Sequence, residues 1–427
     1  MKRRAFLQAA GGMVAAPLVI PSRVLGADAP SNRVAMGLIG LGDRGEANLG
    51  AFMKRAQIVA LCDLDPGSER YEPGKHFGLA PMQAKCAPHA KGAVPLKDFR
   101  ELLARRDIDA VCISTPDHWH APMVVAAAAA GKDIYCEKPL SLTVRHGRAM
   151  VEAVTRAKRV FQCGSQRRSD AKCRKVCELV RNGRIGKLQT VRAGLMGGHW
   201  VRTLRKDAPP TPEPPPEGFD WNFWLGPAPE APYLYNRCHW NWRWHLDYSG
   251  GMVTDWGAHM LDMAHWGMGR DEGGPVEVEG KAQWPARDAL YNTATSFEFT
   301  ATYADGVKVV VKNGPIGVRF EGSEGWIDLD GKSEPAGLFA SEIKPEEIHL
   351  YDSKNDHQGN FLDCVKSRKP TAAPIETAHR TITVAHLGNI AMRLGRKIRW
   401  DPAAEQVVGD DEAAALLDRP LREPWRL

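Results

Sequence analysis

A glycine-rich turn between two apolar segments constrains this chain more than any other feature. The turn is Gly40-Leu41-Gly42-Asp43-Arg44-Gly45, a G-x-G-x-x-G sequence that follows an apolar run beginning at Val34. A second apolar run, 57–62, ends at Asp63, 18 positions after Gly45. A strand, a glycine turn, a helix and an acidic residue in this order are typical of a dinucleotide-binding βαβ unit. We therefore predict that this turn binds a dinucleotide.

The positions of the turn have separate physical tasks. Gly40 allows the tight turn out of the strand, and Gly42 lets the backbone approach a pyrophosphate because it has no Cβ. Gly45 lets the helix pack closely on the strand, and the free N–H groups of the helix N-terminus face the phosphates. Asp63 is placed to accept hydrogen bonds from ribose hydroxyls. Its charge favours NAD over NADP, whose 2′-phosphate it would repel. The expected cofactor-binding set here is Gly40, Leu41, Gly42, Asp43, Arg44, Gly45 and Asp63.

The composition is ordinary for a globular protein of two or three domains. The chain has 427 residues, of which 43% are hydrophobic and 25% charged. The net charge is +6, but residues 1–26 carry four positive charges and no acid, which leaves +2 for the remainder. Because no basic stripe remains, we expect no nucleic-acid partner.

The first 26 residues are typical of an export signal. Arg3-Arg4 precedes an apolar run that is too short and too rich in small residues to span a membrane, and residues 24–26 offer a cleavage point. This twin-arginine pattern resembles the signals of bacterial proteins that are exported already folded. We therefore expect a periplasmic or otherwise exported protein without a membrane span. The alternative is an uncleaved amphipathic N-terminus.

The cysteines do not indicate a disulfide framework. There are nine of them, an odd number, and no C-x-x-C pair occurs. Cys62, Cys112 and Cys136 fall in or at the ends of predicted core strands. We expect buried free thiols, which folding before export would explain.

Strands and helices alternate over residues 33–160, which predicts a Rossmann domain with a parallel sheet and right-handed crossovers. The predicted strands are 34–40, 57–62, 110–114, 133–136 and 159–163, and the predicted helices are 97–106, 121–130 and 142–157. The fold class is therefore α/β in this part of the chain.

The pattern changes in residues 161–356, where we predict an α+β domain with a large, mostly antiparallel sheet. The predicted elements are a helix at 171–182, strands at 188–195, 276–283, 295–302, 307–312, 317–321 and 325–329, and a proline-rich loop at 207–232. Aromatic residues in the loop indicate that it packs onto something. Residues 357–427 hold two predicted helices, 357–369 and 374–395, and a tail expected to pack back on the first domain.

Three polar clusters carry the candidate chemistry. They are Thr115-Pro116-Asp117-His118-Trp119-His120, Glu137-Lys138-Pro139, and the segment from Gly250 to His259. Ligands of open α/β sheets bind beyond the carboxyl ends of the strands, which favours the first two clusters as walls of a site. If the third cluster is helical, Asp255 and His259 are at i,i+4 and share one face.

Together these motifs resemble the Gfo/Idh/MocA family of sugar and polyol oxidoreductases, which includes glucose-fructose oxidoreductase and inositol dehydrogenase. The resemblance covers nearly all of the chain after residue 33, including the segments 164–168 and 321–325 and the run His357-x-x-Asn360-Phe361-x-Asp363. It implies a Rossmann domain followed by an α/β domain on a large, mostly antiparallel sheet. Because the family commonly uses this sheet for oligomerisation, we expect a homo-oligomer, a dimer or a tetramer.

The resemblance places the family's E-K-P lysine at Lys138 and its D-x-x-x-H histidine at His259. Hydride transfer from a secondary alcohol needs a base for the hydroxyl proton, and a histidine titrates near working pH, so His259 is the preferred general base. Lys138 would hold the substrate hydroxyl or polarise the developing carbonyl. Asp255 would bind a neighbouring hydroxyl or orient His259. The alternatives are a structural core histidine and a solvent-exposed lysine.

Further contacts are expected on both sides of this centre. Thr115, Pro116, Glu137 and Lys138 would contact the cofactor, and His120 would lie beside the nicotinamide or behind it.

The segment 237–245 is dense in aromatic and polar groups, so Trp242, Arg243 and His245 are expected to bind a sugar, with aromatic packing under the loop as the alternative. Arg167 and Arg168 are expected to reach the same pocket, or else to form surface ion pairs. The histidine spacings match no compact zinc signature, so no metal is expected.

The leading hypothesis is an exported NAD(P)-dependent oxidoreductase that acts on a secondary hydroxyl of a sugar or polyol. An exported enzyme has no obvious pool of free NAD. The nucleotide would therefore be bound tightly and recycled between two sugars, or would serve a redox-neutral glycosidase or lyase reaction through a 3-keto sugar, as in some relatives. The intact E-K-P motif favours ordinary oxidoreductase chemistry. A sugar-binding protein without turnover is the third hypothesis.

Overall fold

The structure is a computed structural model that describes residues 32–427 except 70–72, 91, 206–210 and 287. The predicted export signal, residues 1–26, lies outside the described residues. Residues 34–427 form one compact unit. The domain boundaries expected at 160 and 356 therefore stay a prediction.

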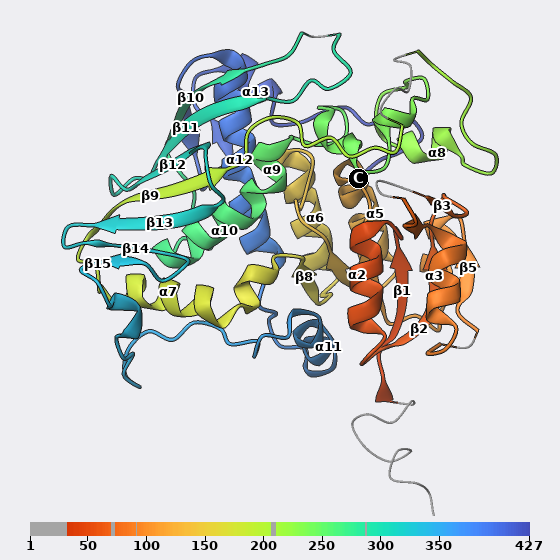
Figure 1. Ribbon diagram of the computed structural model, residues 1–427, viewed down its shortest axis with the longest axis horizontal. Coiled ribbons are helices and arrows are strands. Elements are labelled where there is room, and N and C mark those ends of the chain that lie inside the picture. Colours follow the sequence, from red (N-terminus) through yellow and green to blue (C-terminus); the bar gives the residue numbers. More distant parts are fainter. Residues whose placement is uncertain (1–31, 70–72, 91, 206–210, 287) are drawn as a thin grey trace, which may run out of the picture. The chain divides into compact units, whose positions relative to one another are not determined.

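A six-stranded parallel sheet forms the N-terminal part, in the order β5-β2-β1-β6-β7-β8 (Figure 1). Its strands are β1 (Ala35–Ile39), β2 (Gln57–Cys62), β5 (Val94–Leu96), β6 (Ala110–Ile113), β7 (Asp133–Cys136) and β8 (Phe161–Cys163). Strands β6 and β7 are buried along their whole length, as expected for a parallel sheet covered on both faces. The Rossmann prediction is confirmed. A two-stranded ribbon, β3 (Ser68–Glu69) with β4 (His76–Phe77), lies outside this sheet.

The helices of this part are α2 (Asp43–Phe52), α3 (Leu79–Cys86), α4 (Phe99–Ala104), α5 (Asp117–Ala129) and α6 (Val144–Arg156). Helix α5 begins at Asp117, four residues before the predicted start at 121. Pro116 precedes the first turn with φ −59°, a value that suits a helix start, where its missing N–H costs nothing. The polar cluster 117–120 is therefore the first turn of a helix and not a loop.

A nine-stranded sheet forms the second part, in the order β15-β14-β13-β9-β12-β11-β10-β16-β17. Its strands are β9 (Leu188–Leu195), β10 (Glu277–Gln283), β11 (Ser296–Thr302), β12 (Lys308–Asn313), β13 (Gly317–Gly322), β14 (Trp326–Asp328), β15 (Ser333–Glu334), β16 (Ile398–Asp401) and β17 (Gln406–Val407). Every neighbouring pair is antiparallel except β9 with β12. The predicted mostly antiparallel sheet is confirmed. The added strands β16 and β17 come from the C-terminal region.

Helices cover one face of this sheet, with α10 against β9 and β13 and α12 against β10 and β11 (Figure 1). The helices of the region are α7 (Ala171–Arg181), α8 (Trp221–Leu225), α9 (Met252–Asp255), α10 (Gly257–Met268), α11 (His357–Ser367), α12 (Ile375–Leu394) and α13 (Asp411–Ala415). Burial alternates along β11, because its inward side chains meet these helices while the others face outward.

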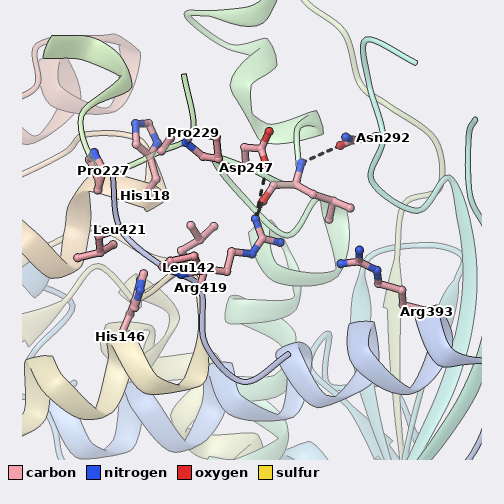
Figure 2. A pocket seen from close by; sticks show the side chains of 13 residues that line it. His118, Leu142, His146, Pro227, Pro229, Asp247, Asn292, Arg393, Arg419 and Leu421 are labelled. Carbon is pink, nitrogen blue, oxygen red and sulfur yellow. Dashed lines mark hydrogen bonds and ion pairs between the residues drawn. The ribbon is translucent and has the colours of Figure 1, made fainter. Parts of the chain in front are cut away.

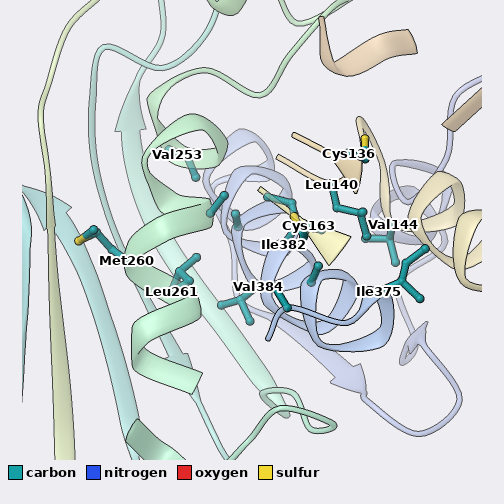
Figure 3. Close-up of a cluster of buried hydrophobic side chains, with 14 of the residues drawn as sticks. Cys136, Leu140, Val144, Cys163, Val253, Met260, Leu261, Ile375, Ile382 and Val384 are labelled. Carbon is teal, nitrogen blue, oxygen red and sulfur yellow. The ribbon is translucent and has the colours of Figure 1, made fainter. Parts of the chain in front are cut away.

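One hydrophobic cluster runs through both parts. Figure 3 shows Leu140 and Val144 facing Ile375 and Ile382 of α12, with Leu261 of α10 on the other side. A continuous core of this kind joins the two sheets in one packed unit.

The proline-rich segment 207–232 is not a plain loop, because Trp221–Leu225 form the short helix α8. Asp220 caps this helix by accepting a hydrogen bond from Phe223 N at 2.9 Å. Phe219 and Trp224 are buried in a separate aromatic cluster, so the segment does pack down as predicted.

All nine cysteines are buried and free. Within the described residues no helix has the length and apolar character that a membrane crossing requires.

Candidate functional site

A cleft of about 400 Å³ opens beyond the carboxyl ends of the parallel strands. One wall is the glycine turn with Asp63, and the floor is the ends of β6 and β7 with Thr115, Pro116, Glu137 and Lys138. The facing wall comes from the second part of the chain. It consists of Trp200, Phe219, Phe223, Trp224, His239, Trp240, Trp242, Arg243, Asp255, Trp256 and His259. Residues far apart in the sequence therefore share one cavity.

The glycine turn has the geometry that a dinucleotide requires. Gly40 has φ +86°, and a Cβ there would lie 2.7 Å from the Ser114 carbonyl. A Cβ on Gly45 would lie 2.0 Å from the Gly40 carbonyl oxygen, so only glycine allows α2 to pack this closely on the turn. Helix α2 starts at Asp43, and Gly42 and Asp43 line the cleft. Its first amides therefore face the space where a pyrophosphate would bind.

Asp63 is held at the end of β2 by two backbone amides. Leu41 N donates to Oδ2 at 2.6 Å, and Asp65 N donates to Oδ1 at 2.8 Å. A carboxylate oxygen can accept more than one hydrogen bond, so ribose hydroxyls can still be bound. The bond from Leu41 also links the acidic residue to the glycine turn, and the two halves of the predicted motif support each other.

Glu137 is a buried carboxylate that organises the floor. It accepts hydrogen bonds from Arg44 Nε at 2.7 Å and from Asn48 Nδ2 at 3.0 Å. Burial opposes its charge, but the Arg44 charge and these hydrogen bonds hold the pKa of Glu137 below its usual value. A Cβ on Gly164 would collide with this carboxylate, 2.4 Å from Oε2. The charged pair with Arg44 therefore connects the first turn of α2 to the end of β7.

Lys138 reaches across the cleft to the second part of the chain. Its Nζ donates to Asp255 Oδ1 at 2.6 Å and to the Asp255 carbonyl at 3.0 Å. Burial opposes the charge of Asp255, but Lys138 and Arg243 lower its pKa to about 2. An ammonium group is thus presented next to a permanently charged carboxylate.

His259 lies beside this pair. Its Nδ1 is buried without a hydrogen-bond partner, and Trp256 packs edge-on against the ring at 5.7 Å. Burial, with the nearby Lys138 charge, moves the pKa of His259 well below its usual value. The imidazole is therefore neutral near pH 7.

If the segment is helical, the i,i+4 spacing places Asp255 and His259 on one face, and the structure divides this segment into two consecutive helices. Helix α9 ends at Asp255 and α10 begins at Gly257, with a break at Trp256. Both side chains nevertheless line the cleft. Trp256, between the two helices, lines the same cavity.

Arg243 is fixed between two indole rings. Its guanidinium carbon lies 4.3 Å from the ring centre of Trp240 and 4.5 Å from that of Trp242. Its Nε is 3.6 Å from Asp255 Oδ1. Cation–π contacts hold the cation at a defined position in the wall.

Two residues expected at the substrate are elsewhere. Arg168 is buried. Its Nε lies 2.9 Å from both carboxylate oxygens of Asp262, and its Nη2 donates a hydrogen bond to Asp271 Oδ1 at 2.7 Å. His245 is buried among Tyr248 and Tyr291. Neither lines the cleft, since Arg168 is a buried ion-pair residue and His245 packs among aromatic residues, so their contact with a substrate stays a prediction.

Two other expected residues stand behind the cleft. Both ring nitrogens of His120 face backbone carbonyls, Nδ1 that of Pro139 at 2.7 Å and Nε2 that of Thr115 at 3.0 Å. It therefore connects the turns after β6 and β7 without lining the cavity, which agrees with the expected place behind the nicotinamide. Arg167 is half-buried and also does not line the cleft.

Several aromatic residues of the site were not predicted. Trp119, Trp200 and Trp256 line the cleft, and Trp200 is 48% exposed. Trp119 and Trp256 belong to the polar clusters 115–120 and 250–259, so the sequence could have indicated that they line the site. Trp200 follows the Gly197-Gly198 pair after β9, where no periodic pattern indicates its direction.

The described residues hold no group of three or more His, Cys, Asp or Glu side chains arranged to bind a metal ion.

Comparison with known proteins gives two family matches. Residues 34–165 match a family described as "Oxidoreductase family, NAD-binding Rossmann fold", and residues 169–427 match "Oxidoreductase family, C-terminal alpha/beta domain", both from the Gfo/Idh/MocA group. Together the matches span almost all of the described chain.

The sequence identity to individual relatives is low. The chain is 26% identical to myo-inositol 2-dehydrogenase of Thermotoga maritima over 73% of this chain and 85% of that protein. It is 31% identical to an alpha-N-acetylgalactosaminidase of Shewanella oneidensis, over 46% of this chain and 43% of that protein. Among solved structures, the aldose-aldose oxidoreductase of Caulobacter crescentus, with glycerol, has a TM-score of 0.61 at 18% identity, covering 86% of this chain and 99% of that one. The WlbA dehydrogenase of Bordetella pertussis, with NADH and UDP-GlcNAcA, has a TM-score of 0.61 at 18% identity with the same coverage.

Proposed function

Because the chain belongs to the Gfo/Idh/MocA oxidoreductase family, we propose that it moves a hydride between a nicotinamide dinucleotide and a secondary hydroxyl of a sugar or polyol. The observation that carries this proposal is the meeting of Lys138, Asp255 and His259 in the cleft that also contains the glycine turn. Relatives whose names specify inositol or aldose substrates support the substrate class.

The roles of these residues follow from where the hydride, the proton and the developing charge go during the reaction. A nicotinamide held beside the glycine turn would take the hydride from the oxidised carbon, and the hydroxyl proton would have to go to a protein group. Neutral His259 accepts this proton. Lys138, held by Asp255, donates a hydrogen bond to the reacting oxygen and stabilises negative charge that develops on it. Asp255 keeps the ammonium in place, and Arg243 and Trp242 bind the rest of the substrate.

The nucleotide is proposed to be NAD, held tightly. Asp63 at the end of β2 would repel a 2′-phosphate. Thr115, Pro116 and Glu137 complete the cradle on the nicotinamide side. Denaturing the purified protein and identifying the nucleotide released by mass spectrometry tests this assignment. Release of NADP, or loss of all nucleotide on simple dialysis, would contradict it.

The base assignment is tested by His259→Ala. The variant is expected to keep its nucleotide and to lose turnover by about 10²- to 10⁴-fold, the usual contribution of a general base. Turnover is measured on a panel of sugars as loss of two hydrogens by mass spectrometry. The exposed His89 provides the matched control, because His89→Ala removes an imidazole that does not line the cleft. Full activity of His259→Ala would refute the role.

A redox-neutral reaction is the second candidate function. Relatives named as glycosidases match the chain over less than half of their own length, including the N-acetylgalactosaminidase of Shewanella oneidensis. In such a reaction the sugar is oxidised, eliminates its leaving group, adds water and is reduced again, so no net NADH forms. Release of a leaving group at constant NAD redox state would favour this function. Accumulation of NADH with a single sugar would favour the dehydrogenase.

Export through the twin-arginine pathway remains part of the proposal and rests on residues 1–26 alone. Replacing Arg3 and Arg4 together by lysine is expected to keep the protein in the cytoplasm. Cell fractionation measures this, and unchanged export of the variant would contradict it. A homo-oligomer is likewise proposed, and light scattering of the purified protein tests it.

A further inference from the structure

The segment that contains helix α8 borders the Asp63 end of the cleft, although it belongs to the second part of the chain. Lys97, directly after β5, donates a hydrogen bond from Nζ to the Gly218 carbonyl at 3.1 Å. Leu64, the neighbour of Asp63, packs against the aromatic cluster of this segment. The segment therefore lies beside the place where Asp63 would bind the adenosine ribose of a dinucleotide.

Phe223 of α8 presents an aromatic ring to this end of the cleft. Its side chain lines the cavity and is half-buried, as are those of Leu64 and Pro116. Phe99 and Trp119 are each 3% exposed and pack against Phe223, with ring centres 6.2 and 5.6 Å from its own. The accessible surface here is therefore apolar and includes an aromatic ring supported from behind by two buried ones.

This surface suits the base of a dinucleotide. Adenine is a flat ring whose faces stack on aromatic side chains and pack against apolar ones. The base is bonded directly to the ribose that Asp63 would bind, so it must lie against the residues around Asp63. The chemistry of the surface therefore matches the group that would reach it.

The C-terminal tail, residues 419–427, runs beside the segment that follows α8. Figure 2 shows Leu421 of the tail and Pro227 of that segment, which both line a second cavity of about 300 Å³. The backbone N–H of Arg422 donates to the Pro227 carbonyl at 2.9 Å. His118 of α5 lines the same cavity, so the tail, the segment after α8 and the first turn of α5 meet here.

The side chain of Arg422 bonds α8 itself. Its Nη1 donates to Asn222 Oδ1 at 2.6 Å, and its Nη2 donates to the Asn222 carbonyl at 2.8 Å. Its Nε donates to the Gly226 carbonyl, directly after the helix, at 2.9 Å. A guanidinium group forms several directed hydrogen bonds at once, so this one side chain restricts both the position and the orientation of α8.

Trp425 of the tail connects α8 to helices α4 and α5. Its ring centre lies 5.6 Å from that of Phe223 and 4.7 Å from that of Trp119. Phe99 stacks on it at 6.2 Å, and the Arg100 guanidinium carbon lies 5.5 Å from the Trp425 ring centre and 5.4 Å from that of Phe223. Trp425 does not belong to the lining of the cleft, so it can act on a ligand there only through the rings that it contacts.

We propose that Phe223 forms one wall of the adenine-binding surface, and that Arg422 and Trp425 are positioning residues that hold Phe223 in this place. The inference rests on the proposed binding of NAD. It adds that residues outside the Rossmann domain complete the nucleotide site, since all three residues lie after residue 165. Their contacts supply a physical reason for the tight nucleotide binding proposed above.

The dissociation rate of NADH is the first measurement. Protein loaded with NADH is mixed with excess NAD in a stopped-flow instrument, and the loss of fluorescence from bound NADH is followed. Phe223→Ala and Trp425→Ala are each expected to release NADH about fivefold faster or more, the lower limit for loss of a stacked base. Trp425→Phe keeps an aromatic ring and is expected to restore slow release. Unchanged release from both alanine variants would overturn the proposal.

Arg422→Gln tests the tail without removing a ring. It is expected to speed NADH release in the same direction, because α8 loses its guanidinium hydrogen bonds. Arg426→Gln is the matched control in the same tail, since the Arg426 side chain is 79% exposed, and it is expected to release NADH as the wild type does. Equal rates for Arg422→Gln and Arg426→Gln would overturn the role of Arg422.

ADP distinguishes the adenine surface from a sugar contact, because it carries adenosine and the pyrophosphate without nicotinamide. In calorimetric titrations, Phe223→Ala and Trp425→Ala are expected to weaken ADP binding by about fivefold or more. Unchanged ADP affinity together with a raised KM for the sugar would assign Phe223 to the sugar and overturn the proposal. If the wild type bound neither NADH nor ADP, the proposed function would fail as well, so the two failures are distinguishable.

A double variant tests whether Trp425 acts through Phe223. Phe223→Ala with Trp425→Ala is expected to release NADH at most about twofold faster than Phe223→Ala alone, because the two residues share one effect. Rates that multiply would show another route and overturn the positioning role. Urea unfolding of the nucleotide-free variants gives the readout of a merely structural role. A Trp425→Ala variant that is less stable but releases NADH as slowly as the wild type would also overturn it.

Discussion

At the scale of single residues, two glycines of helix α2 show how the same side-chain change has opposite effects. A Cβ on Gly45 would be 2.0 Å from the Gly40 carbonyl oxygen, whereas a Cβ on Gly50 would meet no atom within 4 Å. Both glycines lie in the same helix, so their intrinsic helix propensity is equal. The difference between the effects of an alanine substitution at Gly45 and at Gly50 therefore measures the close packing under the dinucleotide turn.

We predict that Gly45→Ala weakens NAD binding by at least tenfold and lowers thermal stability, because α2 must move away from the turn. Gly50→Ala is the control, and it is expected to raise the free energy of unfolding by about 0.5–1 kcal/mol, since alanine is the better helix former. Calorimetric titration with NAD and urea unfolding measure both effects. Equal affinity of Gly45→Ala and the wild type would contradict the packing argument.

Asp117 carries a second prediction at this scale. It is 2% exposed, and burial, with a further contribution from Asp255, raises its pKa to about 7 despite a hydrogen bond from Ser249 Oγ at 2.6 Å. The unfolded chain releases this proton near the ordinary value of 3.8. Between these values the folded state binds more protons, so the contribution of Asp117 to stability falls as pH rises from about 4 to about 7.

Asp117→Asn removes this penalty. At pH 8 the variant is expected to be more stable than the wild type by up to about 4 kcal/mol, and near pH 4 the advantage should vanish. Asp330→Asn, at a side chain that is 78% exposed, is the control and should show no comparable pH-dependent difference. Urea unfolding at both pH values is the measurement. A stability difference that does not depend on pH would show that Asp117 is charged in the folded protein.

At the scale of elements, helix α11 completes a core that begins 300 residues earlier in the chain. Phe361 is fully buried, with its ring centre 6.1 Å from that of Phe52 and 5.9 Å from that of Tyr135. Ion pairs of Arg55 with Asp356 and Asp363, each 2.7 Å, surround this contact. Since those pairs are exposed, we expect the aromatic contact to stabilise the attachment of α11 more than they do.

We predict that Phe361→Ala lowers the free energy of unfolding by about 3–5 kcal/mol, as expected for a cavity left by a buried phenylalanine. Val408→Ala, at a side chain that is 45% exposed, should change it by less than about 0.5 kcal/mol. Urea unfolding compares the two. A small effect of Phe361→Ala would mean that α11 is only loosely attached.

The elements also show what the sequence could and could not predict. The predicted strands 57–62 and 133–136 are found with the same bounds, because apolar runs between glycines and polar turns determine them. The predicted start of helix α5 is four residues too late, since the helix start depends on Pro116 and not on an apolar period. Arg168 looked like a pocket residue because its partners Asp262 and Asp271 are about a hundred positions away in the sequence. Such long-range ion pairs leave no local pattern.

At the scale of the whole molecule, the thiols report on the integrity of the fold. All nine cysteines are buried, and burial raises the pKa of thiols such as Cys112 to about 12. A thiol that is both covered and protonated reacts slowly. In an oxidising compartment, a protein with this arrangement would keep its cysteines reduced only while it stays folded.

We predict that almost none of the thiols of the native protein react with a thiol reagent. All nine thiols are expected to react after unfolding in guanidinium chloride. The colour yield of Ellman's reagent in the two states measures this. Fewer than nine thiols in the unfolded chain would reveal a disulfide, and rapid labelling of the native protein would show that the core opens.

The attachment of α11 has a consequence for anyone who recombines related genes. The two family matches meet between residues 165 and 169, so this point is an obvious choice for a crossover between genes. A transplant of residues 34–165 alone would carry Phe52 and Tyr135 into a host whose own later helix must fill the space of Phe361. Breakpoints that move residues 357–367 together with the first segment would preserve this contact and yield more folded chimeras.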